Sequence, residues 1–471
     1  MNFIPVIGLE IHAELLTKTK IFCSCENKFG EEPNTLVCPV CTGMPGTLPV
    51  LNKNAVELAI KAGLILDCKI NNYSSFDRKN YFYPDLPKSY QITQFYHPLC
   101  GNGHIEINDK KIVIERIHLE EDAGKLLHDK DISIIDYNRC GVPLIEIVTA
   151  PDFRSADEVC DFVREISLRL KYADICDSKL EQGSLRVDLN ISVMEENQNS
   201  FGTRAEIKNL NSLKSIKQAI EYETERQSSL VQNSQKVLLE TRRFDEKTGT
   251  TISMRPKETK GDYRYLPEPD LPQLFITDIE IEKIKNKIPP MPHDRLSKYI
   301  NVYNLTPYEA NLIIEDKEES DFFDSSVSYY TSYKTICNII LNEVNRYLNK
   351  NNLKFSEINI TPLDIAEAAE LYDDKSITKG ALSKIVDIMI KTGDNPKTIA
   401  KSLNLLLDNN SIDIENVVKT VVIENSQAAE EYSKGNKKAF TYLMGQVMRK
   451  LGNGANPETV IKVLEKQLKN I

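Results

Sequence analysis

The 471-residue sequence contains no apolar run close to the ~20 residues that a membrane-spanning helix needs. Its first ten residues, MNFIPVIGLE, lack the basic start and long apolar stretch of a secretory signal, and they lack the Arg and Ser of a transit peptide. Internal repeats and low-complexity tracts are also missing. Ten cysteines in a chain of this length do not indicate a disulfide scaffold. These absences lead us to expect a cytoplasmic protein.

The composition is that of an ordinary globular protein, with 41% hydrophobic and 27% charged residues. The length predicts about three domains. A net charge of −10 argues against a general nucleic-acid binder, but residues 433–471 carry eight Lys or Arg against two Glu. This basic stretch fits a local patch for a polyanion, and a solvated helical surface rich in Lys explains it equally well.

Apolar and polar residues alternate over three segments of the first half, 7–15, 184–193 and 203–208. The period of two predicts antiparallel strands with one face on a core and the other wet. A wet strand face by itself indicates no function. Here it carries Glu, His, Arg and Lys on several strands, as a concave substrate-facing sheet would. Beyond the three prolines of residues 288–295, strand patterns end and helical patterns take over.

Glu10 and His12 lie two residues apart on a predicted strand, so their side chains point the same way with Cβ atoms ~7 Å apart. The segment 118–122, HLEED, adds carboxylates, and strand alternation puts Glu120 and Glu121 on opposite faces. A carboxylate group beside Glu10 and His12 suits Mg²⁺, which binds through few carboxylates together with phosphate oxygens. Taken one at a time, each segment is also explained by a solvated strand end.

Four cysteines form a C-x-C pair and a C-x-x-C pair separated by twelve residues: Cys23, Cys25, Cys38 and Cys41. Thiolates with this spacing can close a tetrahedral site, so we predict structural zinc. Free or redox-active thiols are the alternative. The other six cysteines are scattered and fit small core or surface residues.

Two further segments are rich in basic residues. Residues 76–88, FDRKNYFYPDLPK, interleave them with aromatics, which suits phosphate binding and base stacking. Residues 240–270 are dense in Arg, Asp and Glu, and arginines bind phosphate through paired hydrogen bonds. A structural loop in the first segment and surface ion pairs in the second are the alternatives.

Read together, these segments resemble GatB, the B subunit of the GatCAB amidotransferase. The matching strings span the first 270 residues and are IGLEIHAEL, FDRKNYFYPDLPKSYQITQ, HLEEDAGK, NRCGVPLIEIV, GSLRVDLNIS, GTRAEIKNLNS, ETRRFD and DYRYLPEPD. The C-terminal LMGQVMRKLGNGANPETVIKVLEKQL resembles the tail shared with YqeY proteins. The resemblance covers essentially the whole chain.

The resemblance implies an α+β fold in three parts. An antiparallel-sheet cradle domain similar to glutamine synthetase is expected over residues 1–293, with a zinc-knuckle insertion at 23–41. An all-α helical domain follows over residues 294–405. A small, helical, YqeY-like tail that binds tRNA is expected over residues 406–471.

The resemblance also implies an enzyme, a ligase that forms carbon–nitrogen bonds with glutamine as amido donor. ATP would phosphorylate the side-chain carboxylate of Glu-tRNA(Gln) and Asp-tRNA(Asn), and ammonia would then displace the phosphate. The chain has no amidase-like nucleophile segment, so the implied partners are a GatA-type amidase and a GatC-type small subunit in a heterotrimer. A noncatalytic tRNA-binding scaffold is an alternative from another class. A GatE-type protein is a closer alternative, but residues 267–299 leave no room for its inserted domain.

The same resemblance assigns candidate site residues. The catalytic candidates are Glu10, His12, Lys79, Glu206 and Lys208. The candidate magnesium ligands are Glu10, His12, Glu120 and Glu121. The candidate nucleotide contacts are Arg186, Arg255 and Arg264.

Overall fold

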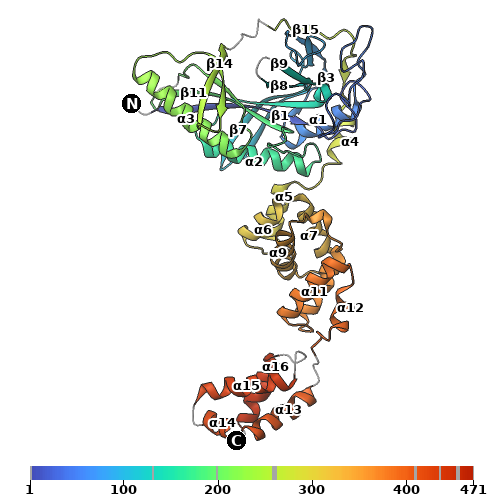
Figure 1. Cartoon of the computed structure of the whole chain (residues 1–471), viewed down its shortest axis with the longest axis vertical. Coiled ribbons are helices and arrows are strands. Elements are labelled where there is room, and N and C mark those ends of the chain that lie inside the picture. The colour runs from blue at the N-terminus through green and yellow to red at the C-terminus, as the bar shows by residue number, and fades with distance from the viewer. Residues whose placement is uncertain are drawn as a thin grey trace. The chain divides into compact units, whose positions relative to one another are not determined.

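The computed structural model of the chain describes residues 3–129, 132–197, 200–256, 263–407, 411–433, 436–451 and 457–469. The chain divides into two compact units, Met1–Pro292 and His293–Ile471, which are described separately below (Figure 1). The first is built on a large sheet and the second is helical, so the expected α+β class is confirmed. Within the described ranges, no helix is long and apolar enough to cross a bilayer.

The first unit is organised around a nine-stranded sheet with the order β14-β13-β12-β11-β1-β10-β7-β6-β2. Neighbouring strands are antiparallel except for the parallel pair β12 and β13. The strands are β1 (Phe3–Glu14), β2 (Lys69–Ile70), β6 (Cys100–Ile107), β7 (Lys110–Glu121), β10 (Pro143–Thr149), β11 (Leu185–Glu195), β12 (Ala205–Lys208), β13 (Glu240–Asp245) and β14 (Thr250–Pro256).

The apolar face of this sheet packs on helices α1 (Lys53–Ile65), α2 (Ala156–Tyr172) and α3 (Leu213–Gln232). The predicted alternation in β1 is confirmed, because Leu9 and Ile11 are buried in that core while Glu10 and His12 face the other way. Burying one face against helices fixes which residues remain on the opposite, polar face.

Smaller elements complete the first unit. They are β3 (Tyr73–Ser74), β4 (Asp77–Asn80), β5 (Tyr90–Thr93), β8 (Lys125–Asp129), β9 (Ile132–Asp136), η1 (Tyr137–Arg139), β15 (Leu266–Pro267), β16 (Leu274–Phe275) and α4 (Asp278–Lys285). Strands β15, β4 and β5 form a separate three-stranded sheet, which carries Lys79.

The second unit contains two groups of buried apolar residues, one between Tyr299 and Leu405 and one between Ile414 and Leu468. The elements with the first group are α5 (Pro292–Asn301), α6 (Pro307–Ile314), α7 (Lys317–Tyr329), α8 (Tyr333–Asn338), the π-helix η2 (Ile339–Val344), α9 (Asn345–Asn351), η3 (Phe355–Glu357), α10 (Pro362–Asp373), α11 (Lys379–Thr392) and α12 (Pro396–Ser402). Those with the second are α13 (Ser411–Glu424), α14 (Ser426–Ser433), α15 (Lys437–Leu451) and α16 (Pro457–Leu468). The domain boundary expected after residue 405 stays a prediction.

Candidate functional site

The polar side chains of β1 meet polar side chains of its two neighbouring strands. Glu10 lies opposite Asp188 of β11, and His12 lies opposite Glu146 of β10. Glu146 in turn lies opposite His118 of β7. Because directly opposed residues of an antiparallel ladder point to the same face, these side chains gather on the face away from the helices.

The first group on this face contains two imidazoles and two carboxylates. His12 Nε2 lies 3.5 Å from Glu120 Oε1 and 3.3 Å from Glu146 Oε2. His118 Nε2 lies 3.6 Å from Glu120 Oε2 and 3.7 Å from Glu146 Oε2. Ligand atoms of His12, Glu120 and Glu146 all lie within 4.8 Å of one another, close enough to share one cation.

The positive charges around this group stabilise the ionised form of the Glu146 carboxylate. Burial by itself would lower the pKa of His12, but the hydrogen bond and charge of Glu146 and the charge of Glu120 raise it to about 9. Burial would raise the pKa of Glu146, but His118, His12 and Lys79 outweigh it and hold that pKa well below its usual value. A cation that binds His12 must therefore displace a proton at neutral pH.

A second group lies beside the first. Glu10, Asp188 and Glu206 offer carboxylate oxygens within 4.8 Å of one another. Lys208 Nζ lies 2.6 Å from Asp188 Oδ2 and 3.1 Å from Glu206 Oε1. Burial alone would lower the pKa of Lys208, but these two carboxylates outweigh it and raise that pKa. Asn190 Nδ2 donates a hydrogen bond of 2.9 Å to Glu10 Oε1.

Glu146 and Asp188 are the carboxylates of these two groups that were not predicted as site residues from the sequence. Glu146 interrupts the apolar run of β10. A lone carboxylate in such a run is the feature of the sequence from which this site residue could have been predicted. Asp188 shares a face of β11 with Arg186 and lies in a segment whose alternation was recognised. Neither signal indicates which strand lies alongside.

Glu121 does not join either group, which corrects its assignment as a magnesium ligand beside Glu10 and His12. Its carboxylate lies 2.5 and 2.6 Å from Lys88 Nζ and accepts a 2.9 Å hydrogen bond from the Ile92 amide. The reason is the alternation of β7, which turns Glu121 away from the face that carries Glu120.

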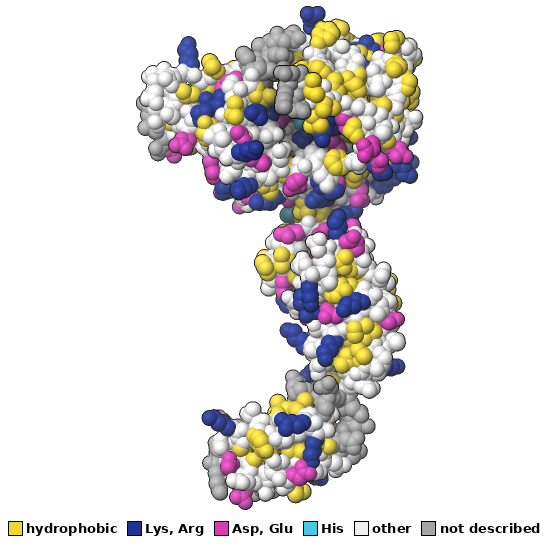
Figure 2. All heavy atoms as spheres, in the orientation of Figure 1, with side chains coloured by type: hydrophobic (Ala, Val, Ile, Leu, Met, Phe, Trp, Pro, Cys, Tyr) yellow, Lys and Arg dark blue, Asp and Glu magenta, His cyan; other side chains and the backbone are white. Residues whose placement is uncertain are grey.

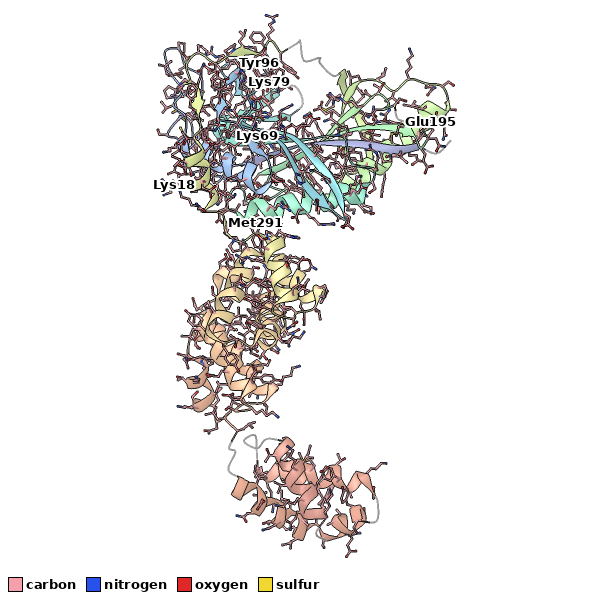
Figure 3. All side chains as sticks on the ribbon, turned by 180° about the vertical axis from the view of Figure 1, so that it is seen from behind. Lys18, Lys69, Lys79, Tyr96, Glu195 and Met291 are labelled. Carbon is pink, nitrogen blue, oxygen red and sulfur yellow. The ribbon has the colours of Figure 1, made fainter. Side chains whose placement is uncertain are left out.

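The remaining predicted residues lie in different surroundings. Lys79 Nζ is 4.9 Å from the centroid of the Tyr263 ring, and Figure 3 places Lys79 and Tyr96 in the same part of the first unit. Arg186 lies opposite His12, and its Nη2 is 2.8 Å from Asp122 Oδ2.

Arg264 and Arg255 were the other two predicted nucleotide contacts. The Arg264 side chain is exposed, and its carbonyl accepts a 2.6 Å hydrogen bond from Asn80. The side chain of Arg255 falls outside the described part of the structure.

The four predicted cysteine ligands form a compact cluster, with sulfur atoms within 4.8 Å of one another. The ammonium of Lys20, a completely buried residue, lies 3.7 Å from Cys41 Sγ. A hydrogen bond from Cys23, helped by the Cys38 amide and the charge of Lys20, lowers the pKa of Cys41 to about 4. The cluster therefore holds at least one thiolate at neutral pH.

Two acidic groups thus lie on one face of the large sheet, and a helical region follows along the chain. Residues 5–282 match the family model described as the GatB/GatE catalytic domain, and residues 321–468 match the one described as the GatB domain. The chain belongs to the GatB family, as its sequence motifs predicted.

Full-length relatives share one name, which describes them as the B subunit of aspartyl/glutamyl-tRNA(Asn/Gln) amidotransferase. The protein of that name from Caldicellulosiruptor bescii is 47% identical over 480 residues, covering 100% of both chains. The one from Ruminiclostridium cellulolyticum is 46% identical over 477 residues, covering 100% of this chain and 98% of that protein. The one from Caldanaerobacter subterraneus is 46% identical over 473 residues, covering 99% of this chain and 100% of that protein.

Proposed function

We propose that this chain is the catalytic B subunit of a tRNA-dependent amidotransferase, a ligase that makes Gln-tRNA(Gln) and Asn-tRNA(Asn) from the misacylated Glu and Asp forms. ATP phosphorylates the side-chain carboxylate of the attached amino acid, and glutamine-derived ammonia displaces the phosphate. The observation that carries the proposal is the pair of acidic groups side by side on one face of a GatB-family catalytic domain. A carboxylate is a poor acyl donor, whereas an acyl phosphate carries a good leaving group.

The residues present fit magnesium at both groups. Glu120 and Glu146 with His12, and Glu10 with Asp188 and Glu206, offer the oxygen-rich donor sets that hard divalent cations prefer. Magnesium held there would neutralise phosphate charge during phosphoryl transfer. Compared with the magnesium ligands expected from the sequence, this proposal adds Glu146, Asp188 and Glu206 and leaves out Glu121.

Cationic side chains around the acidic groups have distinct proposed roles. Lys208 holds Asp188 and Glu206 together, because its ammonium reaches both carboxylates. Lys79 has the proposed role of holding an anionic group of the substrate, and the action of its charge on Glu146 supports this. Arg186, which lies next to His12, remains a proposed nucleotide contact. So do Arg255 and Arg264.

The cysteine cluster fits structural zinc. A buried ammonium such as that of Lys20 requires an anionic partner, and the Cys41 thiolate is the group in contact with it that can supply the charge. Four thiolates around one zinc ion would tie residues 23–41 into a knuckle. The metal is assigned no part in the reaction.

The proposed complex contains a GatA-type amidase and a GatC-type small subunit, because the names of the relatives make them subunits and glutamine must be hydrolysed elsewhere. Charged tRNA(Gln) and tRNA(Asn) are the proposed macromolecular substrates. Because charged tRNAs serve translation, we propose that the complex acts in the cytoplasm.

The test is to remove one carboxylate from each acidic group in a reconstituted complex. Glu146→Gln and Glu10→Ala should each lower ATP-dependent amidation of charged tRNA by at least about 100-fold, because charge stabilisation by a bound cation contributes several kcal/mol. Ammonium replaces glutamine in this assay, which bypasses any damage to ammonia delivery. Glutamine hydrolysis should persist in both variants.

Glu106→Gln is the matched control, because this exposed glutamate lies on β6 of the same sheet and away from both groups. It should leave the amidation rate unchanged. Near-normal amidation by Glu146→Gln would show that the His12 group does not hold the reactive phosphate.

A further inference from the structure

A buried threonine contacts the second acidic group from a neighbouring strand. Thr241 of β13 is 4% exposed, and its hydroxyl donates a 3.0 Å hydrogen bond to Glu206 Oε2. Strands β12 and β13 run parallel, with Glu206 directly opposite Thr241. Residues opposed in this way point to the same side of a sheet, so the hydroxyl meets the carboxylate on the polar face.

The two oxygens of Glu206 contact groups on two different strands. Oε1 lies 3.1 Å from Lys208 Nζ of β12, and Oε2 accepts the hydrogen bond from Thr241 of β13. The last torsion angle of a glutamate side chain is broad, so a carboxylate turns easily unless it is held. A contact at each oxygen restricts that rotation and fixes the direction in which Glu206 presents its lone pairs.

Another carboxylate of the same group is oriented in a similar way. Asn190 Nδ2 donates a 2.9 Å hydrogen bond to Glu10 Oε1. The amide of Asn190 and the hydroxyl of Thr241 are both neutral. A neutral donor orients a carboxylate without cancelling its charge, whereas an ammonium such as that of Lys208 offsets part of it. Neutral donors therefore suit carboxylates that attract a divalent cation.

The strand that carries Thr241 is fixed from the opposite face of the sheet. The next residue, Arg242, is buried, and it donates hydrogen bonds of 2.8 and 2.9 Å to the hydroxyl and carbonyl of Thr251 on β14. Its Nε also lies 3.1 Å from Glu223 of α3. A buried polar network that is satisfied in this way is rigid. It therefore holds the backbone next to Thr241 in one position.

We propose that Thr241 is a positioning residue for a divalent cation at the second acidic group. It acts through Glu206, whose carboxylate it orients, and does not bind the ion itself. The inference rests on the proposed function, in which magnesium binds at this group. Groups that hydrogen-bond to a metal ligand change metal affinity by about 10- to 100-fold when they are removed.

The experiment measures Mn²⁺ binding by the reconstituted complex without ATP or tRNA, and electron paramagnetic resonance counts the free ion. Thr241→Val replaces the hydroxyl with a methyl group of similar size, and it should weaken one class of Mn²⁺ sites about 10-fold or more. Thr241→Ser keeps the hydroxyl and should bind Mn²⁺ as the wild type does. In amidation assays, Thr241→Val should need more Mg²⁺ for its half-maximal rate and should regain the wild-type kcat at saturating Mg²⁺.

Thr251→Val is the matched control. Thr251 is also 4% exposed and lies on the next strand, but its hydroxyl contacts Glu223 and Arg242 instead of the acidic group. The control should lower the stability of the chain and leave Mn²⁺ affinity unchanged. An equal loss of affinity in Thr241→Val and Thr251→Val would overturn the proposal, because a general loss of packing would then explain both. Weak binding by Thr241→Ser would overturn it as well.

Glu206→Gln separates this inference from the proposed function. It should remove the class of Mn²⁺ sites that Thr241→Val weakens. Loss of these sites in Glu206→Gln with wild-type affinity in Thr241→Val would overturn the role of Thr241 alone. Unchanged Mn²⁺ binding in Glu206→Gln would refute both the cation at this group and the positioning role. Wild-type complex without ATP-dependent amidation would refute the proposed function, whatever the Mn²⁺ result.

Discussion

At the scale of single residues, Lys20 is the side chain with the most unusual surroundings. It is completely buried, and its ammonium contacts the Cys41 thiolate at 3.7 Å and the Tyr137 carbonyl at 3.4 Å. Four thiolates around a divalent ion leave an excess negative charge, which a neighbouring ammonium offsets. Partners of this kind tune affinity without binding the metal themselves.

Replacing Lys20 should therefore weaken zinc binding. We expect Lys20→Met, which keeps most of the volume, to lower zinc affinity by about 10- to 100-fold in competition with a chromophoric chelator. Lys18→Met, at an exposed lysine two residues earlier, should leave the affinity unchanged. Full zinc retention in a Cys38→Ser, Cys41→Ser variant would instead refute the zinc site itself.

At the scale of elements, the residue that follows the π-helix η2 contacts a buried acid, Glu319 of α7. A π turn carries one extra residue, which rotates the following side chains by about 100° around the helix axis. Asn345, directly after η2, donates hydrogen bonds of 3.1 and 3.2 Å to the two oxygens of Glu319. Burial raises the pKa of Glu319 to about 7 despite these bonds.

This raised pKa predicts a pH-dependent stability. The folded chain retains a proton on Glu319 between about pH 4.5 and 7 that the unfolded chain releases, so the free energy of unfolding falls as pH rises through that window. Glu319→Gln removes the titration and should gain up to about 3 kcal/mol over the wild type between pH 5 and pH 8. Urea unfolding of the full chain measures it, and exposed Glu318→Gln is the control. Curves of both proteins that stay parallel across this range would contradict the assignment.

At the scale of the whole molecule, the C-terminal helices have a buried core of their own, made by residues between Ile414 and Leu468. The face drawn in Figure 2 shows Lys and Arg interspersed with acidic and apolar side chains over the second unit. Such a surface suits contacts with phosphates at several points better than a single deep site.

Removing residues after position 410 should therefore impair tRNA binding without affecting the chemistry. We expect a several-fold higher KM for charged tRNA, an unchanged kcat and normal glutamine hydrolysis in the reconstituted complex. Binding should also depend less steeply on salt, because fewer counterions are released. An unchanged KM and salt dependence would show that the tail does not contact tRNA.

Local patterns in the sequence determined the family, the α+β class and the direction of each polar side chain on its strand. Glu10 and His12 share a face because side-chain direction alternates residue by residue, which is a property of the local backbone. For the same reason, alternation already separated Glu120 from Glu121.

Which strands lie side by side was decided only by the tertiary structure. Glu146 meets His12, and Asp188 meets Glu10, through pairings between strands more than 130 residues apart in sequence. Strand order and register follow from how the apolar faces pack on the helices, a non-local balance that no single segment encodes.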